Sequence, residues 1–491
     1  MNEQAGKFEL QRREKKDRIA QLGIDPYGGR IDALELSGQV RGRYVEEQDG
    51  QRARCAGRIM LHRDIGKLIF VTLRDSSGTI QLGLSRQLLA EQWEFIKLLD
   101  LGDLIFAEGA LGRTKTGELT IWADKVEILS KALLPPPEKF HGLADPDLRY
   151  RQRYVDLWAN SEVMERFLRR SGMVAATRAF LQERGFVEVE TPMMQAQAGG
   201  AAARPFTTHH NALDMDLFLR IAPELYLKRL LVGGMEKVFE INRNFRNEGL
   251  STRHNPEFTM LELYQAYADY QVMAELTEEL IIALIEKYCS GTKIKFGDIE
   301  VDYSRPWRRA KYTELLAEYG GCDMDDMESV RREARRLGLH EADRDDAVVA
   351  SDVFEATVEE KLVNPTFVID YPAAICPLTK QSRQDPRFAE RFELYIAGME
   401  VANAYTELND PEVQERNFRR QLRGLAQDDS MARMDEDFIT ALKYGMPPAG
   451  GLGIGIDRLV MLLTGVTSIR DVILFPLLRP QAGGTGGPKA E

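Results

Sequence analysis

The chain has 491 residues and a formal net charge of −12 at pH 7, and 44% of its residues are hydrophobic. This length exceeds what one hydrophobic core usually supports, so we expect two domains. No stretch approaches the roughly 20 apolar residues that a membrane-spanning helix needs, and segment 1–18 is too charged for a secretory signal. These features predict a cytoplasmic protein, and the net negative charge argues against nonspecific coating of nucleic acid.

Cysteine spacing favours neither a zinc site nor a disulfide framework. The four cysteines lie far apart, at positions 55, 289, 322 and 376, and none belongs to a CxxC pair. We therefore expect reduced thiols.

The N-terminal segment 1–50 is predicted to be a helical extension. Its basic residues fit a solvated helix and a nucleic-acid-binding arm about equally well. These residues are Lys7, Arg12, Arg13, Lys15, Lys16 and Arg18.

Segment 51–132 alternates short apolar runs with turn signals. Strands are expected at about 67–73 and 79–84, on either side of Asp75-Ser-Ser-Gly78, and two more flank Lys115-Thr-Gly-Glu118. A helix is expected at about 86–99. Four or five strands and one helix in this length indicate a small Greek-key barrel of the oligonucleotide-binding (OB) type.

Proline residues after Leu134 mark a boundary, because proline lacks the amide proton and fixes its own backbone angle. We place a linker at 133–160 and a larger domain at 161–480. This domain opens with an amphipathic helix at 161–184, which ends at Gly185 and precedes a strand at 186–190. A glycine-rich tail at 481–491 is expected to be disordered.

The larger domain is predicted to be α+β, with a mainly antiparallel sheet flanked by helices. Strands are expected near 214–221, 236–246, 257–267, 391–407 and 451–456, and helices near 271–288, 411–444 and 457–464. Between about 291 and 385 the sequence predicts an inserted, largely helical segment.

An arginine-bearing hairpin is the strongest functional signal. Strand patterns precede Arg246 and follow His254, and Glu248 and Arg253 lie in the turn between them. Fixed guanidinium groups suit the phosphates of a nucleotide, and polar side chains suit its base. A purely structural hairpin rarely concentrates charge in this way.

A glycine-rich strand leads into the helix that carries Arg458. Glycines at 451, 453 and 455 fall on one face of the strand, which leaves room for a ligand against the backbone. A cation in the first turn of a helix opposes the helix dipole, so an anionic ligand would explain Arg458 better than chance. A packing strand with a salt-bridged arginine is the alternative.

Segment 391–408 predicts a hairpin that brings two acids together. With a turn at Ala397-Gly398, Tyr395 pairs with Glu400, and Glu393 is a diagonal neighbour on the same face. Magnesium carrying phosphate oxygens would relieve the repulsion between these acids, although exposed strand glutamates are a simpler alternative.

Further polar residues reach the same pocket only if a strand bulges. Asn403, Tyr405 and Glu407 share a parity opposite to that of Glu400, so we predict a β-bulge near Ala402. A separate run on one parity comprises Phe258, Met260, Glu262 and Tyr264. A glutamate among apolar neighbours needs a partner, which an arginine or a ligand amine could supply. Glu224 opens a helix after Pro223, where an acid is common for dipole reasons alone.

Together these segments resemble the three signature motifs of the class II aminoacyl-tRNA synthetases. The segment ending in Thr191-Pro192 resembles motif 1, and the Phe-Arg-Asn-Glu hairpin resembles motif 2. The glycine strand with Arg458 resembles motif 3. A barrel ahead of this domain is similar to subclass IIb, which comprises the lysyl, aspartyl and asparaginyl enzymes. Segments 198–206, 220–228 and 403–410 are similar to the bacterial lysyl family, over about residues 50–480 in all.

The resemblance implies a role for each matching residue. Arg246 and Arg458 are implied catalytic residues, with Arg246 on the α-phosphate of ATP and Arg253 and Arg458 towards the γ-phosphate. Glu248, His254 and Phe258 match the adenine site, and Glu393 and Glu400 the magnesium carboxylates. The residues implied to bind lysine are Gly200, Glu224, Glu262, Tyr264, Asn403, Tyr405 and Glu407.

The resemblance also implies partners. Arg63, Phe70 and Gln81 match the positions that read the anticodon, and unstacked bases are recognised by aromatic stacking and polar edges. The implied partners are L-lysine, ATP, Mg²⁺, tRNA(Lys) and a second copy of the chain in a homodimer. Tyr405, Thr406 and Ala198 stand where the family usually has phenylalanine, serine and proline.

Three alternatives stay open at this point. An aspartyl or asparaginyl enzyme would leave Glu224 and Glu407 without a cationic partner. A lysine ligase that modifies a translation factor is disfavoured by the barrel, and a non-catalytic nucleic-acid-binding protein leaves the arginines and acids unexplained.

Overall fold

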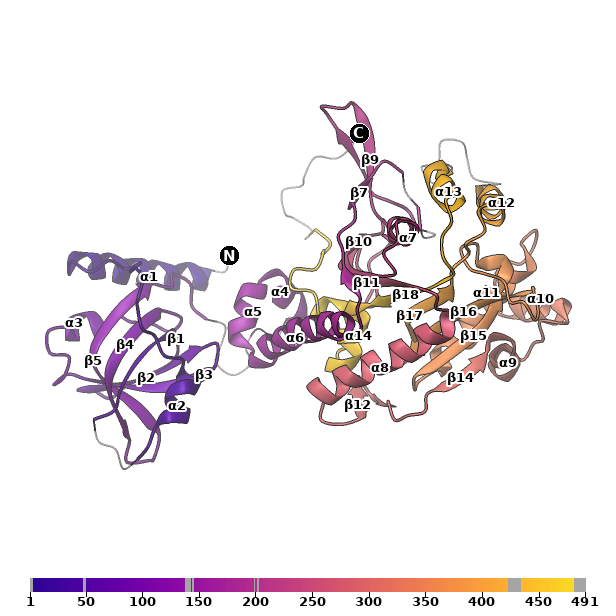
Figure 1. Cartoon of the computed structure of the whole chain (residues 1–491). Coiled ribbons are helices and arrows are strands. Elements are labelled where there is room, and N and C mark those ends of the chain that lie inside the picture. The colour runs from indigo at the N-terminus through magenta and orange to yellow at the C-terminus, as the bar shows by residue number, and fades with distance from the viewer. Residues whose placement is uncertain are drawn as a thin grey trace. The chain divides into compact units, whose positions relative to one another are not determined.

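The computed structural model describes residues 3–46, 50–136, 143, 145–197, 199–200, 203–422 and 434–480. The chain divides into two compact units, Met1–Ala144 and Asp145–Glu491 (Figure 1). Among the described residues, no helix combines the length and apolar character needed to cross a bilayer. The predicted tail at 481–491 lies outside the described residues.

The N-terminal unit contains a closed five-stranded barrel, as the OB-type pattern predicts. The strands follow the order β1-β2-β3-β5-β4 around it. Their bounds are β1 (Arg52–Asp64), β2 (Leu68–Asp75), β3 (Gly78–Ser85), β4 (Leu104–Arg113) and β5 (Leu119–Ser130).

The helix predicted at 86–99 is much shorter in the structure. Only α3 (Trp93–Ile96) is helical there. Leu89, Phe95 and Leu99 are all buried in the barrel core, at spacings that do not fit one helical face. Packing into the barrel therefore overrides the local helical tendency of this segment.

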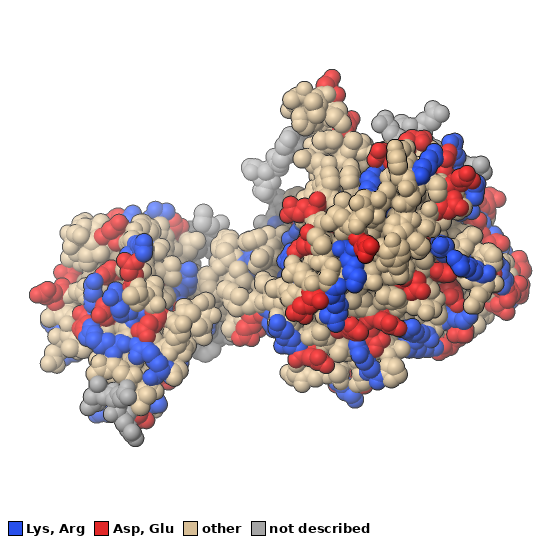
Figure 2. Space-filling view, viewed as in Figure 1, with Lys and Arg blue, Asp and Glu red and all other residues tan. Residues whose placement is uncertain are grey.

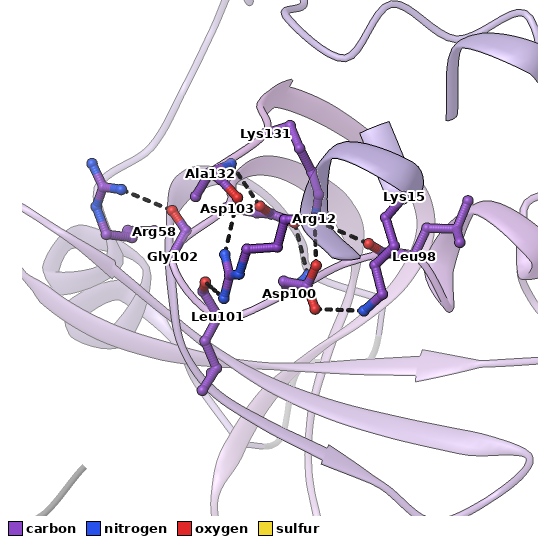
Figure 3. A network of polar contacts seen from close by, with 10 residues as sticks. All are labelled: Arg12, Lys15, Arg58, Leu98, Asp100, Leu101, Gly102, Asp103, Lys131 and Ala132. Carbon is purple, nitrogen blue, oxygen red and sulfur yellow. Dashed lines mark hydrogen bonds and ion pairs between the residues drawn. The ribbon is translucent and has the colours of Figure 1, made fainter. Parts of the chain in front are cut away.

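Helix α1 (Glu3–Gln21) is fastened to the barrel by a buried polar network (Figure 3), and α2 (Ser37–Arg43) follows it. Lys131 Nζ donates to Asp100 at 2.6 Å and to Asp103 at 2.8 Å. Lys15 Nζ donates to Asp100 at 2.6 Å, and Arg12 donates to the carbonyl oxygens of residues 101 and 132 at 2.9 Å each. Arg12 and Lys15 therefore stabilise the fold of this unit. The choice between a solvated helix and a nucleic-acid-binding arm stays open only for the other basic residues of the helix.

The C-terminal unit is built on an eight-stranded sheet, which is mainly antiparallel as predicted. Its strand order is β14-β15-β16-β17-β18-β11-β10-β6, and only the two outermost pairs are parallel. The strands are β6 (Val187–Glu188), β10 (Lys237–Phe245), β11 (Glu257–Ala266), β14 (Arg308–Lys311), β15 (Thr366–Pro372), β16 (Phe388–Ile396), β17 (Met399–Thr406) and β18 (Ala449–Gly455).

The prediction of a largely helical insertion at 291–385 needs correction. Strands β14 and β15 lie within it and extend the main sheet, and β12 (Lys293–Phe296) pairs with β13 (Ile299–Asp302). Thr366 pairs with Tyr395 of the neighbouring strand, so the segment is integral to the sheet. Its helices are α9 (Tyr312–Leu315), α10 (Met327–Arg336) and α11 (Asp346–Thr357), with a π-helical turn at Leu316–Gly320 and 3₁₀ turns at Glu359–Lys361 and Ala373–Ile375.

One face of the sheet is covered by helices, as Figure 1 shows. Helices α6 (Ser161–Glu183), α8 (Tyr270–Tyr288) and α14 (Ile456–Thr464) share a core with the sheet residues Leu261, Leu263, Leu452, Ile454 and Ala404. Because side chains alternate along a strand, the residues between these point to the opposite face. Helices α7 (Glu224–Val232) and α13 (Glu436–Lys443) cover only part of that opposite face.

The remaining elements surround this sheet. The continuous helix predicted at 411–444 is seen as α12 (Pro411–Leu422) and α13, and residues 423–433 lie outside the described part. The predicted linker contains two short helices, α4 (Pro146–Arg151) and α5 (Arg153–Ala159). The other elements are β7 (Met194–Gln195), β8 (Thr207–His210) and β9 (Met215–Leu219), which form a small sheet, and a 3₁₀ turn at Ile469–Asp471.

Candidate functional site

The register of the central strands places polar side chains around a glycine strip. Glu262 of β11 pairs with Gly453 of β18, which pairs with Asn403 of β17, which pairs with Glu393 of β16. In the next row on the same face, the corresponding residues are Tyr264, Gly451, Tyr405 and Arg391. Since glycine has no side chain, β18 forms the floor of a hollow between the two flanking strands.

The predicted hairpin and bulge place Glu400 beside this hollow. Ala397 and Gly398 have φ angles of +53° and +67°, and Tyr395 pairs with Glu400. The register shifts between Leu394 and Tyr395, which leaves Val401 as the extra residue beside Ala402. Both predictions are confirmed, and the bulge lets acids of opposite parity reach one cavity.

The hollow opens into two adjoining cavities. The larger has a volume of about 970 Å³, and the smaller, at the Arg246 hairpin, about 220 Å³. Predicted residues that line the larger cavity are Gly200, Glu224, Arg246, Glu248, Glu262, Tyr264, Glu393, Glu400, Asn403 and Tyr405. Those that line the smaller are Arg246, Glu248, Arg253, His254, Phe258, Glu400, Asn403 and Arg458.

Glu407 is the one predicted ligand contact in this unit that does not line either cavity. It is fully buried, and a Cβ added to Gly451 would collide with its Oε1 and with the ring of Tyr264. Gly451 lines the larger cavity and lies in one row with Tyr264 and Tyr405, so Glu407 Oε1 lies on the hollow side of β18, over the Gly451 backbone.

Glu224 and Glu407 share a cationic partner within the protein. Lys228, one turn after Glu224 on α7, is fully buried and donates to Glu224 Oε1 at 2.6 Å. It also forms an ion pair with Glu407 Oε2. This corrects the expectation that the two acids would lack a partner unless the substrate carried a cation. Tyr405 Oη donates to Glu224 Oε2 at 3.0 Å, which orients the acid from the other side.

Glu262 is a buried acid beside other acids. Glu240 pairs with it directly across the strands, and Arg220 donates to Glu240 at 2.7 Å. Burial, followed by the nearby charge of Glu224, raises the pKa of Glu262 to about 8. Its side chain has only a long hydrogen bond from Tyr264 Oη, at 3.4 Å. The charges of Arg220 and Arg246 offset the effect of burial only in part, and a ligand ammonium group would stabilise the ionised carboxylate further.

The opposite end of the hollow is cationic. The guanidinium carbon of Arg246 lies 5.2 Å from the centre of the Phe258 ring, and its Nε is buried without a hydrogen-bond partner among the described residues. Arg253 donates to the carbonyl oxygen of Gly398 at 2.9 Å. These arginines come from one hairpin, so their spacing is fixed by β10 and β11.

Arg458 is held by Glu400 and His254. It donates to the Glu400 carbonyl oxygen at 2.6 Å, and its Nη2 lies 3.0 Å from His254 Nε2. A guanidinium group can only donate, so His254 Nε2 accepts and its proton lies on Nδ1, 2.9 Å from Ser251 Oγ. Burial and the charge of Arg458 lower the pKa of His254. Glu400 Oε2 lies 3.7 Å from Arg458 Nη1, so the protein itself supplies a carboxylate near this arginine, as the alternative of a salt-bridged arginine expects.

Glu393 and Glu400 both face the larger cavity, but each has its own protein partner. Glu393 is ion-paired with Arg391 and accepts hydrogen bonds from Tyr371 and Tyr395 at 2.7 Å each. Arg391 and Arg458 therefore offset the charges of the two acids within the chain, so the repulsion between the acids does not by itself require a metal. Among the described residues, no group of three or more His, Cys, Asp or Glu side chains forms a metal cage. Two carboxylates fit Mg²⁺ only if a ligand supplies further oxygens, as phosphates do.

The structure adds residues that the sequence reasoning missed. Lys228 lies four residues after Glu224, a spacing that predicts an ion pair on one helix face and could have revealed it. Arg391 lies close to Glu393 in the same strand, so the sequence alone could have revealed it as a partner. Arg220 and Arg204 carried no local signal, because only the fold brings them to the strand hairpin.

In the barrel, the three predicted nucleic-acid contacts lie on adjoining rows. Arg63 pairs with Phe70, which pairs with Gly83, and Gly83 pairs with Trp122. The guanidinium carbon of Arg63 is 5.4 Å from the Phe70 ring centre. Gln81 is on the neighbouring row and donates to Thr120 at 2.9 Å. The rows form a compact surface of aromatic rings, a cation and an amide.

Comparisons with known proteins agree with this architecture. Residues 145–479 match the family described as tRNA synthetases class II (D, K and N), and residues 53–129 match the OB-fold nucleic acid binding domain. Proteins named lysine–tRNA ligase are similar over almost the whole chain. The one from Pelotomaculum thermopropionicum is 53% identical over 96% of this chain and 94% of its own length. Those from Carboxydothermus hydrogenoformans and Clostridium perfringens are 52% and 47% identical, over 96% and 98% of this chain and 97% of their own length each.

The chain therefore belongs to the class II tRNA synthetases of the D, K and N group. Within that group it belongs to the lysine–tRNA ligase family. The class membership explains why a nucleotide-type arginine hairpin and an acidic pocket share one antiparallel sheet.

Proposed function

We propose that the hollow over β18 binds L-lysine and ATP and that the chain ligates lysine to tRNA(Lys) through a lysyl-adenylate. The observation that carries this proposal is the order of side chains along the hollow. Buried acids lie at one end, Arg246 lies in the middle of the two cavities, and Arg253 and Arg458 lie at the other end. The lysine carboxylate would attack the α-phosphorus of ATP in line and release pyrophosphate. A terminal ribose hydroxyl of the tRNA would then accept the lysyl group and release AMP.

The acidic end is proposed to hold the two ammonium groups of lysine. Glu262 and Glu407 are buried and have oxygen atoms that the described protein leaves without short hydrogen bonds. Asn403 and Tyr405 flank the glycine floor, and Gly200, with a φ of +87°, lets the chain approach within contact of Ala222 and Glu224. Anionic partners are what a desolvated ammonium group requires.

The cationic end is proposed to hold ATP. Arg246 would contact the α-phosphate, and Arg253 and Arg458 the γ-phosphate. Phe258 would stack on the adenine ring, with Glu248 and His254 at its polar edge. Because no side chain becomes covalently attached, positioning and charge neutralisation account for catalysis, with Arg246 and Arg458 as the catalytic residues.

Glu393 and Glu400 are proposed to hold Mg²⁺ together with the phosphate oxygens of ATP. Both line the larger cavity beside Arg246, which supports this assignment. The ion would neutralise phosphate charge when bound. Tyr371 and Tyr395 keep one Glu393 oxygen oriented by donating to it, which limits the positions the other oxygen can take.

The barrel, at about 51–132, is proposed to bind the anticodon of tRNA(Lys) through Arg63, Phe70 and Gln81. Stacking on Phe70 and hydrogen bonds from Gln81 suit unstacked bases. Figure 2 shows a band of lysine and arginine side chains across the visible face of this unit, which would attract the RNA backbone despite the net negative charge of the chain.

Three further assignments remain proposals. The catalytic domain spans about 161–480, and two copies of the chain form a homodimer through the motif 1 region. Exposed apolar side chains around that region, including Leu168, Val187 and Met194, support a protein interface. A cytoplasmic location is supported by the cysteines, all of which are unpaired.

An amino-acid panel in an ATP–pyrophosphate exchange assay tests the proposed function. We expect exchange with L-lysine and none above background with aspartate or asparagine, because the acids Glu224 and Glu262 line the pocket and suit an ammonium group better than a carboxylate or an amide. Exchange dependent on aspartate or asparagine would support the alternative within the same group. Absence of both exchange and ATP binding would support a non-catalytic nucleic-acid-binding protein.

Lysine binding is expected to release protons near neutral pH. Burial is the largest cause that raises the pKa of Glu262 and of Glu407 to about 8, so both carboxyl groups are largely protonated at about pH 7. An incoming ammonium group favours the ionised form and lowers these pKa values, so protons leave as lysine binds. Lysine affinity should then rise with pH between about 6 and 8 and the proton release should fade above about pH 9.

Calorimetry checks this expectation. Titrations of lysine into the protein at one pH, in buffers with different ionisation enthalpies, should differ by the number of protons released. ATP titrated alone is the control, since its proposed site does not contact these acids. Identical heats for lysine in all buffers would contradict the proposed pairing of the acids with substrate ammonium groups.

A further inference from the structure

The proposed pocket for the substrate lysine also contains a lysine residue of the protein, Lys228, which the proposed function does not explain. Lys228 has no exposed surface and lies between the two acids at the end of the pocket. A buried ammonium group is costly unless anions surround it, and the protein places one here where its substrate is also a cation.

Lys228 contacts one carboxylate oxygen of each acid, so the contacts of the two other oxygens decide what each acid can still bind. Lys228 takes Glu224 Oε1 and Glu407 Oε2, and Tyr405 Oη donates to Glu224 Oε2. Glu224 is therefore satisfied by the protein at both oxygens. Glu407 Oε1 is buried without a hydrogen-bond partner among the described residues, and it lies over the Gly451 backbone on the hollow face of the sheet.

We propose that Lys228 is a positioning and specificity-determining residue that cancels one of two pocket acids and aims Glu407 Oε1 at a single substrate ammonium group. With both carboxylates ionised, Glu224, Glu407 and Lys228 together carry one negative charge, which matches one side-chain ammonium. Without Lys228 the two acids would repel each other in a buried site, so Glu407 would keep its proton to a higher pH and would receive an ammonium group less readily. This inference rests on the proposed function, because it assigns the pocket to lysine.

The charges around Glu407 agree with this division of roles. Burial raises its pKa to about 8, whereas the Lys228 charge acts in the opposite direction and the Glu224 charge adds to the rise. The groups that face Glu407 are Lys228, Glu224, Glu262, Tyr264 and Tyr405. Lys228 is the single cation in this set, so its removal should push the pKa of Glu407 higher.

The test uses the variants Lys228→Met and Lys228→Gln in the full-length protein. Both remove the charge, but glutamine can still donate hydrogen bonds to the acids. In lysine-dependent pyrophosphate exchange we expect both variants to raise the KM for lysine at least about tenfold at pH 7.5, with the KM for ATP unchanged. The pH at which the lysine KM levels off should move upward by about one unit in both. Lys287→Met, an exposed lysine on α8, is the matched control.

A compensating variant separates charge from packing. Glu224→Gln combined with Lys228→Met restores one negative charge without an internal cation, so its pH profile should return towards that of the wild type. If Lys228→Gln retains the wild-type lysine KM and pH profile, Lys228 is a structural hydrogen-bond donor and the inference is wrong. It is also wrong if the double variant keeps the shifted profile of Lys228→Met. Wild-type protein without lysine-dependent exchange would instead refute the proposed function.

Discussion

Replacing Arg246 with alanine is expected to lower kcat/KM for lysine-dependent ATP–pyrophosphate exchange about 1,000-fold, which corresponds to roughly 4 kcal/mol of transition-state stabilisation. Arg246 lines both cavities, and its Nε is buried without a partner among the described residues. It is therefore placed where the α-phosphate of ATP would meet the lysine carboxylate. Negative charge develops at that point, so a fixed guanidinium group there acts mainly on the transition state.

The control for this prediction lies in β10, shortly before Arg246. Arg243 is ion-paired with Glu257 at 3.5 Å and lines neither cavity, so Arg243→Ala should change exchange less than about threefold. Thermal unfolding of both variants checks that the fold is intact. Near-normal exchange by folded Arg246→Ala would show that the hairpin does not hold the reacting phosphate.

Gly451→Ala is expected to raise the KM for lysine about 100-fold while leaving the KM for ATP within about twofold. A Cβ at this position would strike Glu407 Oε1 and the Tyr264 ring. The backbone cannot move away, because β18 is hydrogen-bonded between β11 and β17 on both sides. One methyl group would therefore displace Glu407 Oε1, the oxygen that is proposed to receive the substrate ammonium group.

Gly455→Ala is the matched control on the same strand. Its added Cβ would lie 3.7 Å from the nearest atom, the Val401 carbonyl oxygen, which is ordinary van der Waals contact. We expect its lysine KM to stay within about threefold of the wild type. If the KM for lysine of Gly451→Ala is as small as that of Gly455→Ala, this floor is not the lysine site, whatever the KM for ATP.

The sequence determined the local elements and the residue types of the site. Strand alternation predicted β10, β11, β16, β17 and β18, and the parity conflict between Glu400 and Asn403 predicted the bulge that the structure places at Val401. Glycines at alternate positions predicted the open floor, and the barrel pattern predicted the N-terminal fold. These features could be predicted because backbone periodicity, turn chemistry and the absence of a Cβ act between residues close in sequence.

Only the tertiary structure decided which charges meet. It showed that Lys228 pairs with both Glu224 and Glu407, that Arg391 offsets Glu393, and that β14 and β15 belong to the main sheet. It also shortened the helix predicted at 86–99 to α3, because burial in the barrel outweighs a weak local preference. Ion pairs such as Lys228 with Glu407 depend on contacts between segments far apart in the chain, and a residue's sequence neighbours do not report these contacts.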